Sequence, residues 1–456
     1  MLISEIFQDR KYMRSLMMIA LPLIIQQVIT YSVNLIDTMM IGSFGDVPLS
    51  AVNLVNQFYL LFSMLIFGSI SGGNVLNAQF WGKKEVRGIH RVMGIQFFVA
   101  LIAEIGFLCV SQLFPYEILH LYSEDEAVIS AGITYLRIIS PVFILFPIGQ
   151  IYSGTLRCTG NARIPMLISA VALGLNALLN YLLIFGKFGF PALGLPGAAI
   201  ATVIARLVEA FLYIFITYTR RLPTASRPKD MISFDRPLVM LMLKKGAPVI
   251  VNEMIWGLGT NAYAAIYAGI STASIAAYSA VNPVDNIAQA LFIGVGDACA
   301  VIIGNLLGAG SIEKAKRYAK YTLRLSLALV LLTGLLLFSL RAPILSLYNL
   351  SDEALSLAQK LMIVVAFTLW LRTSNYTIII GILRPGGEAL FCLIVEGAAM
   401  WFAGIPVARL LAVHFGLPVY WVYFGLVTEE AVKLVVFWIR YRSGKWAVNL
   451  VGNKTP

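Results

Sequence analysis

The chain has 456 residues, of which 59% are hydrophobic and 12% are charged. With a mean hydropathy of +0.82, this is more apolar surface than a soluble fold can bury, so the composition excludes a soluble globular protein and indicates a polytopic membrane protein. The net charge of +11 would indicate anionic partners in a soluble protein, but here its meaning depends on where the basic residues lie.

Hydrophobic stretches long enough to cross about 30 Å of hydrocarbon recur along the whole chain. In chain order they lie near 15–41, 48–74, 92–113, 128–155, 164–186, 194–218, 242–269, 275–305, 319–340, 356–384, 388–412 and 418–440. We therefore predict an all-α polytopic membrane protein with twelve transmembrane helices in two pseudo-symmetric six-helix bundles. The N-terminal lobe is expected over 1–218, a cytoplasmic linker over 219–243 and the C-terminal lobe over 244–456.

The second half of the chain repeats landmarks of the first at an offset of about 226 residues. Pro22 matches Pro248, and the motif Leu-Arg-x-x-Gly at 156–160 returns at 383–387. A period of this length indicates two fused bundles, an arrangement that many secondary transporters share. Because six crossings return the chain to the same side, the two halves are predicted to be parallel repeats.

Basic residues gather in alternate connections, including 219–243. The positive-inside rule therefore predicts that both termini are cytoplasmic, in the cell (inner) membrane. The excess positive charge needs no nucleic-acid partner. The N-terminal stretch is charged and amphipathic and has no cleavage-site pattern, so we predict no removable signal peptide.

No sequence pattern indicates an enzyme. The four cysteines and three histidines have no close pairing, so we predict neither a disulfide framework nor a zinc site. No HExxH or P-loop motif occurs. Gly294-Val295-Gly296-Asp297 matches the GxGD pattern of intramembrane aspartyl proteases, but Asp285 on the same span cannot supply the second, facing aspartate. We predict no catalytic residues and no cofactor.

The first hydrophobic stretch carries Asp37 one turn after Asn34, with no basic residue in reach along its own helix. A carboxylate at this depth must bind a proton or a cation that neutralises it, which is the minimum requirement for ion-coupled transport. The alternative is an aspartate held by hydrogen bonds from neighbouring helices. Gln27 and Asn34 on this stretch, and the matched residues Asn56 and Asn282, are candidates for lining a substrate cavity.

The fifth and sixth stretches carry Asn176, Asn180 and Thr202. The two asparagines stack on one helical face and should point inward, toward a segment whose small residues allow close helix approach. With Asp37 they form an all-oxygen set suited to a hard cation such as Na⁺. The alternative is that they act as interhelical hydrogen-bonding glue. We predict no metal site beyond this Na⁺.

The second half places its charged residues differently. Glu253 follows Pro248 as Gln27 follows Pro22, and Tyr263 takes the position that matches Asp37. Arg372 could pair with Glu253, and both would then be structural. Local pairing is expected for Glu209 with Arg206, and for Glu429 and Glu430 with Lys433. We treat Glu253, Asp285 and Arg372 as secondary candidates.

Taken together, the motifs resemble those of the multidrug and toxic compound extrusion (MATE) family of antiporters over nearly the whole chain. The matching segments are Asn34-Leu-Ile-Asp37-Thr-Met-Met-Ile-Gly42, Leu156-Arg157-x-x-Gly160-Asn161, Asn176-x-x-x-Asn180-Tyr-Leu-Leu-Ile-Phe-Gly186, Leu193-Gly194-x-x-Gly197-Ala-Ala-Ile-Ala-Thr202 and Gly304-Asn-Leu-Leu-Gly308-Ala-Gly310. The resemblance implies two six-helix lobes, a central cavity, and Na⁺ or H⁺ coupling to the export of cationic, amphipathic compounds.

Carried over by motif, the amino-terminal cation site of that family falls on Asp37, Asn176, Asn180 and Thr202. The chain departs from one branch of the family in its tenth stretch, where Arg372 lies in place of an expected acid and Asp285 could supply the missing charge. We predict a monomeric antiporter for small organic cations. The alternative is a flippase for lipid-linked oligosaccharides or other amphiphiles, from the same superfamily.

Overall fold

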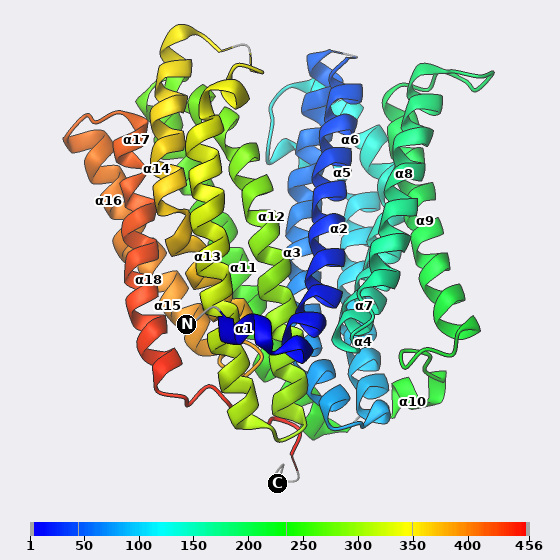
Figure 1. The fold of residues 1–456 in the computed structure, drawn as a ribbon. Coiled ribbons are helices and arrows are strands. Elements are labelled where there is room, and N and C mark those ends of the chain that lie inside the picture. The colour runs from blue at the N-terminus through cyan, green and yellow to red at the C-terminus, as the bar shows by residue number, and fades with distance from the viewer. Residues whose placement is uncertain (1–3, 44, 234, 349, 453–456) are drawn as a thin grey trace. The chain divides into compact units, whose positions relative to one another are not determined.

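The computed structural model describes residues 4–43, 45–233, 235–348 and 350–452, and their regular structure is helical (Figure 1). The chain forms two compact units. The N-terminal unit comprises Ile25–Ile250, and the C-terminal unit comprises the residues up to Ile24 together with those from Val251 onward. The predicted lobe ranges were set by the hydrophobic stretches of the sequence, whereas the two units are defined by which residues pack together. The chain passes between the units inside two helices, each time two residues after a proline, Pro22 or Pro248.

The N-terminal unit contains the helices of the first half and the start of α11. Its elements are most of α2 (Arg10–Gly42), α3 (Asp46–Gly82), α4 (Val86–Leu113), α5 (Pro115–His120), α6 (Glu126–Ile139), α7 (Val142–Cys158), α8 (Arg163–Phe185), α9 (Leu195–Thr219), α10 (Pro228–Ile232) and the beginning of α11 (Arg236–Ile270).

The C-terminal unit contains α1 (Ser4–Gln8), the start of α2 and the remainder of α11. Its other elements are α12 (Thr272–Gly308), α13 (Ile312–Leu345), α14 (Asp352–Tyr376), η1 (Thr377–Leu383), α15 (Ala389–Ala399), η2 (Met400–Gly404), α16 (Ile405–Arg409), η3 (Leu410–His414), α17 (Val419–Val422) and α18 (Phe424–Arg442). The three η segments are π-helical turns, so each of these spans is wound more widely in part of its length.

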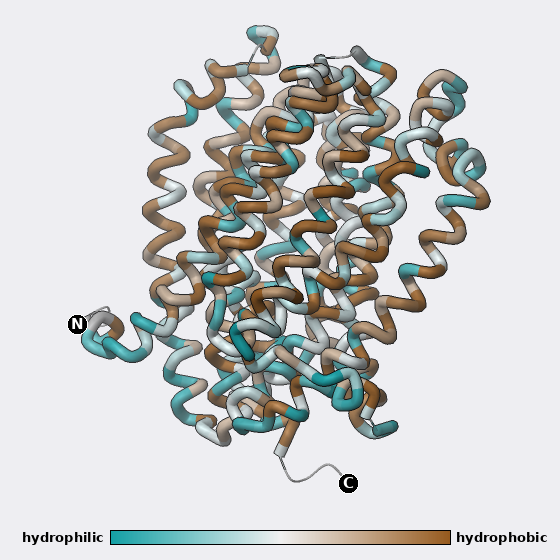
Figure 2. The backbone as a smooth tube through the Cα atoms, turned by 90° about the vertical axis from the view of Figure 1, so that its right-hand side faces the viewer, coloured by the Kyte–Doolittle hydropathy of each residue, from teal (hydrophilic) through white to brown (hydrophobic). Residues whose placement is uncertain are grey.

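The fold is that of a membrane protein. In the described part of the chain, nine helical segments are long and apolar enough to cross a membrane, and the pair α6 and α7, bent by 51°, would make a tenth. Hydrophobic residues predominate along the long helices (Figure 2). Helices occupy all twelve predicted stretches, but α11 and α18 are not among the nine segments that are long and apolar enough. Asn252, Glu253 and Asn261 interrupt α11, and Glu429, Glu430, Lys433 and two arginines lie along α18.

Two glycines show the duplication at the level of atomic contacts. In the N-terminal unit, a Cβ atom built on Gly68 of α3 would lie 2.6 Å from the Cα of Ile250. In the C-terminal unit, a Cβ atom on Gly294 of α12 would lie 2.5 Å from Cγ1 of Ile24. Gly68 and Gly294 are separated by as many residues as Ile24 and Ile250. Each unit therefore uses one glycine to let a helix of one half pack closely against a helix of the other half.

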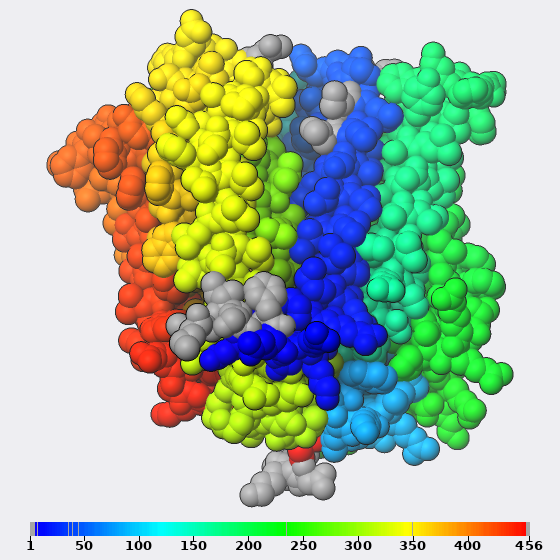
Figure 3. All heavy atoms as spheres, viewed as in Figure 1, coloured from blue at the N-terminus to red at the C-terminus, as the bar shows by residue number. Residues whose placement is uncertain are grey.

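The start of the chain packs on α13 within the C-terminal unit. Tyr12 is fully buried, and its hydroxyl lies 2.8 Å from Thr322 Oγ1. Its ring stands 4.8 Å from that of Tyr318, centroid to centroid. Figure 3 shows the dark-blue N-terminal segment against the yellow-green start of α13. The amino-terminal end of α2 is thus held against α13 by a cluster of aromatic side chains.

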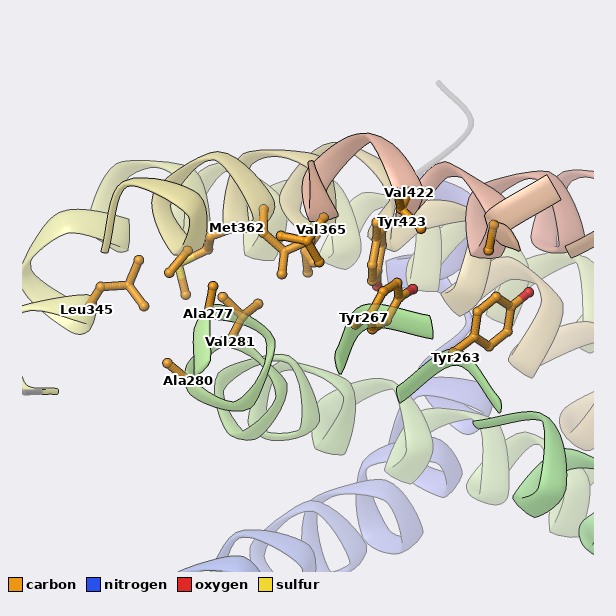
Figure 4. Packing of buried hydrophobic residues seen from close by; sticks show 14 of the residues in the cluster. Tyr263, Tyr267, Ala277, Ala280, Val281, Leu345, Met362, Val365, Val422 and Tyr423 are labelled. Atoms are coloured by element: carbon orange, nitrogen blue, oxygen red, sulfur yellow. The ribbon is translucent and has the colours of Figure 1, made fainter. Parts of the chain in front are cut away.

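A second cluster fills the C-terminal unit farther along α11. Tyr263 and Tyr267 of α11 pack with Val281 of α12, Met362 of α14 and Tyr423 (Figure 4). Tyr263 is 2% exposed and Tyr267 is fully buried. The Tyr263 hydroxyl donates to Glu429 at 2.7 Å, whereas the Tyr267 hydroxyl is buried without a hydrogen-bond partner in the described part of the chain.

Candidate ion and substrate site

A cavity of about 440 Å³ lies within the N-terminal unit, between α2, α3, α6, α7, α8 and α9. Much of its wall is polar, which is unusual for the interior of a membrane bundle. The polar side chains that line it are Thr30, Asn34, Asp37, Thr38, Asn53, Asn56, Tyr59, Tyr135, Asn176, Asn180, Thr202, Arg206 and Glu209.

The four residues predicted as a cation site form one hydrogen-bonded chain along this wall. Asn180 Nδ2 donates to Asp37 Oδ1 at 2.8 Å and lies 3.5 Å from Asn176 Oδ1. Asn176 Nδ2 donates to Thr202 Oγ1 at 3.3 Å. The Thr202 hydroxyl in turn donates to the carbonyl of Ala198 at 3.0 Å. Residues from α2, α8 and α9 are therefore brought together at one place.

Local sequence explains this convergence. Asn176 and Asn180 stand one turn apart on α8, so both amides point to the same side. On α9, a Cβ atom at Gly197 would lie 2.6 Å from the Leu183 carbonyl oxygen. Glycine at this position lets α9 approach α8 closely enough for Thr202 to reach Asn176.

The two acids that line the cavity, Asp37 and Glu209, have different hydrogen-bond partners. Glu209 accepts a hydrogen bond from Arg206 Nη1 at 2.6 Å, whereas Asp37 accepts one from a neutral amide. Among the described residues, no Lys or Arg forms an ion pair with Asp37. The Asn180 side chain also keeps its Oδ1 atom buried without a hydrogen-bond donor. A proton on Asp37, or a small hard cation beside these oxygens, would satisfy both groups.

The predicted cavity residues divide between the two units. Asn34 and Asn56 line the cavity together with Asp37. Gln27 lies on α2 but is not among the lining residues. Asn282 lies on α12 of the C-terminal unit, where it donates to the Tyr278 hydroxyl at 3.1 Å.

Glu253 and Asp285 of the C-terminal unit form ion pairs with arginines of distant sequence position. Arg384 donates from both terminal nitrogens to Glu253 Oε1, at 3.2 Å each. Arg372 instead forms an ion pair with Asp285 and donates to the Tyr423 hydroxyl at 3.3 Å. The proposed pairing of Glu253 with Arg372 is therefore wrong, because packing places Arg384 beside Glu253.

The expected local ion pairs are confirmed. Arg206 pairs with Glu209 on α9. On α18, Lys433 Nζ lies 2.8 Å from Glu429 Oε1 and 2.7 Å from Glu430 Oε1. These pairs are set by helical spacing alone, which is why the sequence was sufficient to predict them.

Two groups of residues were missed by sequence reasoning. Arg384 belongs to a repeated motif at the end of the predicted stretch 356–384, where no role was assigned to it, yet it is buried and neutralises Glu253. Tyr59, Tyr135 and Phe143 line the cavity, and no signal in the sequence separates them from other buried aromatic residues. Glu104 of α4, another acid in a predicted span, is not among the residues that line the cavity.

Comparison with known proteins gives a consistent result. A sequence model of the MatE family matches residues 22–182 and, a second time, residues 248–410. The chain is similar to the probable multidrug resistance protein YoeA of Bacillus subtilis, with 27% identity over 437 residues that cover 94% of this chain and 93% of YoeA. It is also 23% identical to a probable multidrug resistance protein NorM of Thermotoga maritima, over 95% of this chain and 93% of that protein.

The fold agrees with these similarities. A solved structure, described as the outward-facing conformation of a multidrug resistance MATE family transporter of the MOP superfamily, matches with a TM-score of 0.87. The match covers 94% of this chain and 96% of that chain, at 18% identity. Since the family match spans both halves, the chain belongs to the MATE family of multi-pass membrane transporters, which are not enzymes.

Proposed function

We propose that this transporter exports cationic, amphipathic compounds in exchange for Na⁺ or H⁺, and that Asp37 binds the coupling ion. The relatives YoeA of Bacillus subtilis and NorM of Thermotoga maritima, which are named as probable multidrug resistance proteins, support the substrate class. Both similarities extend over more than nine-tenths of this chain.

The observation that carries the proposal is the environment of Asp37. This carboxylate lies in a polar cavity, accepts a hydrogen bond from an amide and has no basic partner among the described residues. An unpaired negative charge is costly inside a membrane protein. Binding a proton or Na⁺ removes that cost, so occupancy by the ion changes the stability of the conformation that holds it.

The neighbouring residues have supporting roles in this proposal. Asn176, Asn180 and Thr202 supply neutral oxygens that orient the carboxylate and complete the ion site. In this proposal Asn34 and Asn56 contact substrate in the same cavity, and Gln27 and Asn282 are further candidates for substrate contact. The ion pairs of Glu253 with Arg384 and of Asp285 with Arg372 support structural roles for these charges.

We further propose that transport proceeds by alternating access of two lobes, 1–218 and 244–456, joined by the linker 219–243. The protein would act as a monomer in the cell membrane, with both termini in the cytoplasm. Entry of the ion at Asp37 would reorganise α2 near Pro22 and release the substrate. A flippase for pyrophosphate-linked lipids is less well supported, because the arginine in the cavity is already balanced by Glu209.

The Asp37→Asn variant tests this proposal. The amide keeps the size of the side chain but cannot carry a charge. In liposomes containing the purified protein, we expect ion-driven efflux of a fluorescent cation to fall to the rate of protein-free liposomes. Imposing Na⁺ and H⁺ gradients separately would identify the ion. Undiminished ion-driven efflux by the variant would disprove the role of Asp37.

A further inference from the structure

A group of basic side chains gathers where the start of the chain packs on α13. Residues 5–14 and 313–324 together carry eight basic residues but only three acids. The basic residues are Arg10, Lys11, Arg14, Lys314, Lys316, Arg317, Lys320 and Arg324, and the acids are Glu5, Asp9 and Glu313. In the part of the chain that the structure describes, one ion pair forms among them, between Lys316 and Glu313 at 2.9 Å. Most of this positive charge therefore has no acidic partner there.

Aromatic contacts hold these two segments side by side within the C-terminal unit. The Tyr12 ring lies 4.8 Å from the ring of Tyr318 and 5.5 Å from that of Tyr321, centroid to centroid. The Tyr318 hydroxyl donates to Asp9 Oδ1 at 3.4 Å, so this acid is engaged inside the contact. Arg317 Cζ lies 5.8 Å from the centroid of the Tyr318 ring. Segments that are about 300 residues apart in sequence thus bring their charges to one surface, which Figure 3 shows around the dark-blue N-terminal segment.

The charged side chains of this surface point outward. Arg10 and Arg14 are one turn apart and both exposed, whereas Tyr12 and Leu16 are buried. The start of the chain is therefore amphipathic, and Figure 2 shows it as largely hydrophilic. On α13 the basic residues next to the tyrosines recur at three- and four-residue spacing, which places them along one side of the helix. They are Arg317 and Lys320, which are exposed, and Arg324, which is half-buried.

The position of these charges along the helices matches a boundary between membrane and water. Both α2 and α13 are long and apolar enough to cross a membrane. The apolar run of α2 starts after Ser15, and that of α13 starts after Arg324. The basic residues therefore end where the hydrocarbon begins, at the depth of the lipid phosphates. Tyrosine is enriched at this depth because its ring is apolar and its hydroxyl group is polar.

We propose that the starts of α2 and α13 form a binding site for the phosphate of an anionic phospholipid. Clusters of Lys and Arg beside a membrane-spanning helix attract anionic lipids, and a guanidinium group binds phosphate oxygens in a forked geometry. A zwitterionic phospholipid has the same phosphate, but its cationic headgroup is repelled by the basic side chains. An anionic phospholipid that contacts both segments stabilises the packing of the start of α2 on α13.

Two triple variants with the same change in charge test this site. Arg14→Gln/Arg317→Gln/Lys320→Gln removes three exposed charges from the surface, and Arg87→Gln/Arg220→Gln/Lys229→Gln removes three exposed charges from the N-terminal unit. Native mass spectrometry of the purified full-length protein measures binding of phosphatidylglycerol and of phosphatidylcholine with identical chains. Each Lys or Arg near an anionic membrane surface is worth about fivefold in affinity. We expect the affinity ratio of phosphatidylglycerol to phosphatidylcholine to fall by at least about tenfold in the first variant and to stay unchanged in the second.

The wild-type protein provides a second measurement that does not depend on how the variants fold. Raising the ionic strength should weaken binding of phosphatidylglycerol and leave that of phosphatidylcholine unchanged, because salt screens exposed charges. Equal binding of the two lipids by the wild type, or equal loss of the ratio in both triple variants, overturns the proposal. Displacement of phosphatidylglycerol by soluble glycerol phosphate at equal concentration would assign the surface to free anions and overturn it as well.

Discussion

Asp37 and Tyr263 occupy matching positions in the two halves of the chain, but their surroundings differ. Asp37 lines a polar cavity of the N-terminal unit and accepts a hydrogen bond from Asn180. Tyr263 is buried in the tyrosine-rich core of the C-terminal unit and donates to Glu429 at 2.7 Å. The helix scaffold is shared, whereas the polar function at this position belongs to the first half.

A second pair of residues shows the same contrast. Arg206 on α9 and Lys433 on α18 are separated by the same distance in sequence as Leu156 and Leu383. Arg206 has one carboxylate partner and remains partly open to the cavity. Lys433 is 5% exposed and lies between two carboxylates, Glu429 and Glu430. The base of the N-terminal unit therefore has one acidic partner at a cavity wall, whereas the base of the C-terminal unit is enclosed by two.

These differences show which features the two halves share and which polar features differ between them. The shared features are helix positions and close contacts such as Gly68 with Ile250 and Gly294 with Ile24. The differences lie in which polar groups are neutralised by protein partners. In the C-terminal unit the acids are largely paired with Arg or Lys, whereas Asp37 in the N-terminal cavity has no such partner in the part of the chain that the structure describes.

The largest expected effect is a loss of stability on replacing Lys433, compared with the same replacement of Arg206. Lys433→Met leaves two buried carboxylates without their cation, so we expect the free energy of unfolding to fall by about 3–5 kcal/mol. Arg206→Met should cost less, because it leaves one carboxylate without its cation rather than two. Thermal unfolding of the purified proteins in detergent measures both variants. Equal losses would show that the two bases are buried and paired to the same degree.

Removing the Tyr263 hydroxyl group tests whether Tyr263 is structural, in contrast to the proposed role of Asp37 in ion coupling. Tyr263→Phe leaves a Glu429 oxygen without a donor, so stability should fall by about 1.5–3 kcal/mol. Ion-driven efflux by the folded variant should keep its dependence on the gradient. Asp37→Asn should show the opposite pattern, with lost coupling and nearly unchanged thermal stability. The comparison fails if Tyr263→Phe abolishes coupling while leaving the unfolding temperature unchanged.

The smallest effect distinguishes the two glycine contacts. At Gly68 an added Cβ meets backbone atoms of Ile250, at 2.6 Å from Cα and 2.7 Å from N. At Gly294 an added Cβ would lie 2.5 Å from Cγ1 of Ile24, but its nearest backbone neighbour, the nitrogen of Ile24, lies 3.1 Å away. Overpacking against backbone costs about 1–3 kcal/mol, and replacing helical glycine by alanine returns up to about 1 kcal/mol.

We therefore expect Gly68→Ala to destabilise the protein by about 1 kcal/mol and Gly294→Ala to destabilise it less, because the backbone contacts of the added Cβ are longer at Gly294. Unfolding temperatures measured side by side would check the order of the two variants. A larger loss for Gly294→Ala would contradict the packing described for α12.

Much of the candidate site was predictable because its geometry is local to single helices or marked by unusual residue types. The four-residue spacing of Asn176 and Asn180 places both amides on one face. Asp37 stands out in its apolar stretch because a charged carboxylate without a basic partner is energetically costly there. The pairs Arg206 with Glu209 and Lys433 with Glu429 follow from the same helical spacing. The partners of Glu253 and Asp285 were not predictable, because they lie on helices distant in sequence.

The sequence by itself determined the all-helical membrane class, the internal duplication and the residues of the candidate cation site, because hydrophobic length, repeat spacing and helical periodicity are properties of the chain alone. Tertiary structure decided which charges are neutralised. Whether Arg384 or Arg372 reaches Glu253, and whether Arg206 faces a cavity or a second acid, depends on how separate helices pack. Such contacts are set by side-chain shape and close helix approach, which no spacing along one helix records.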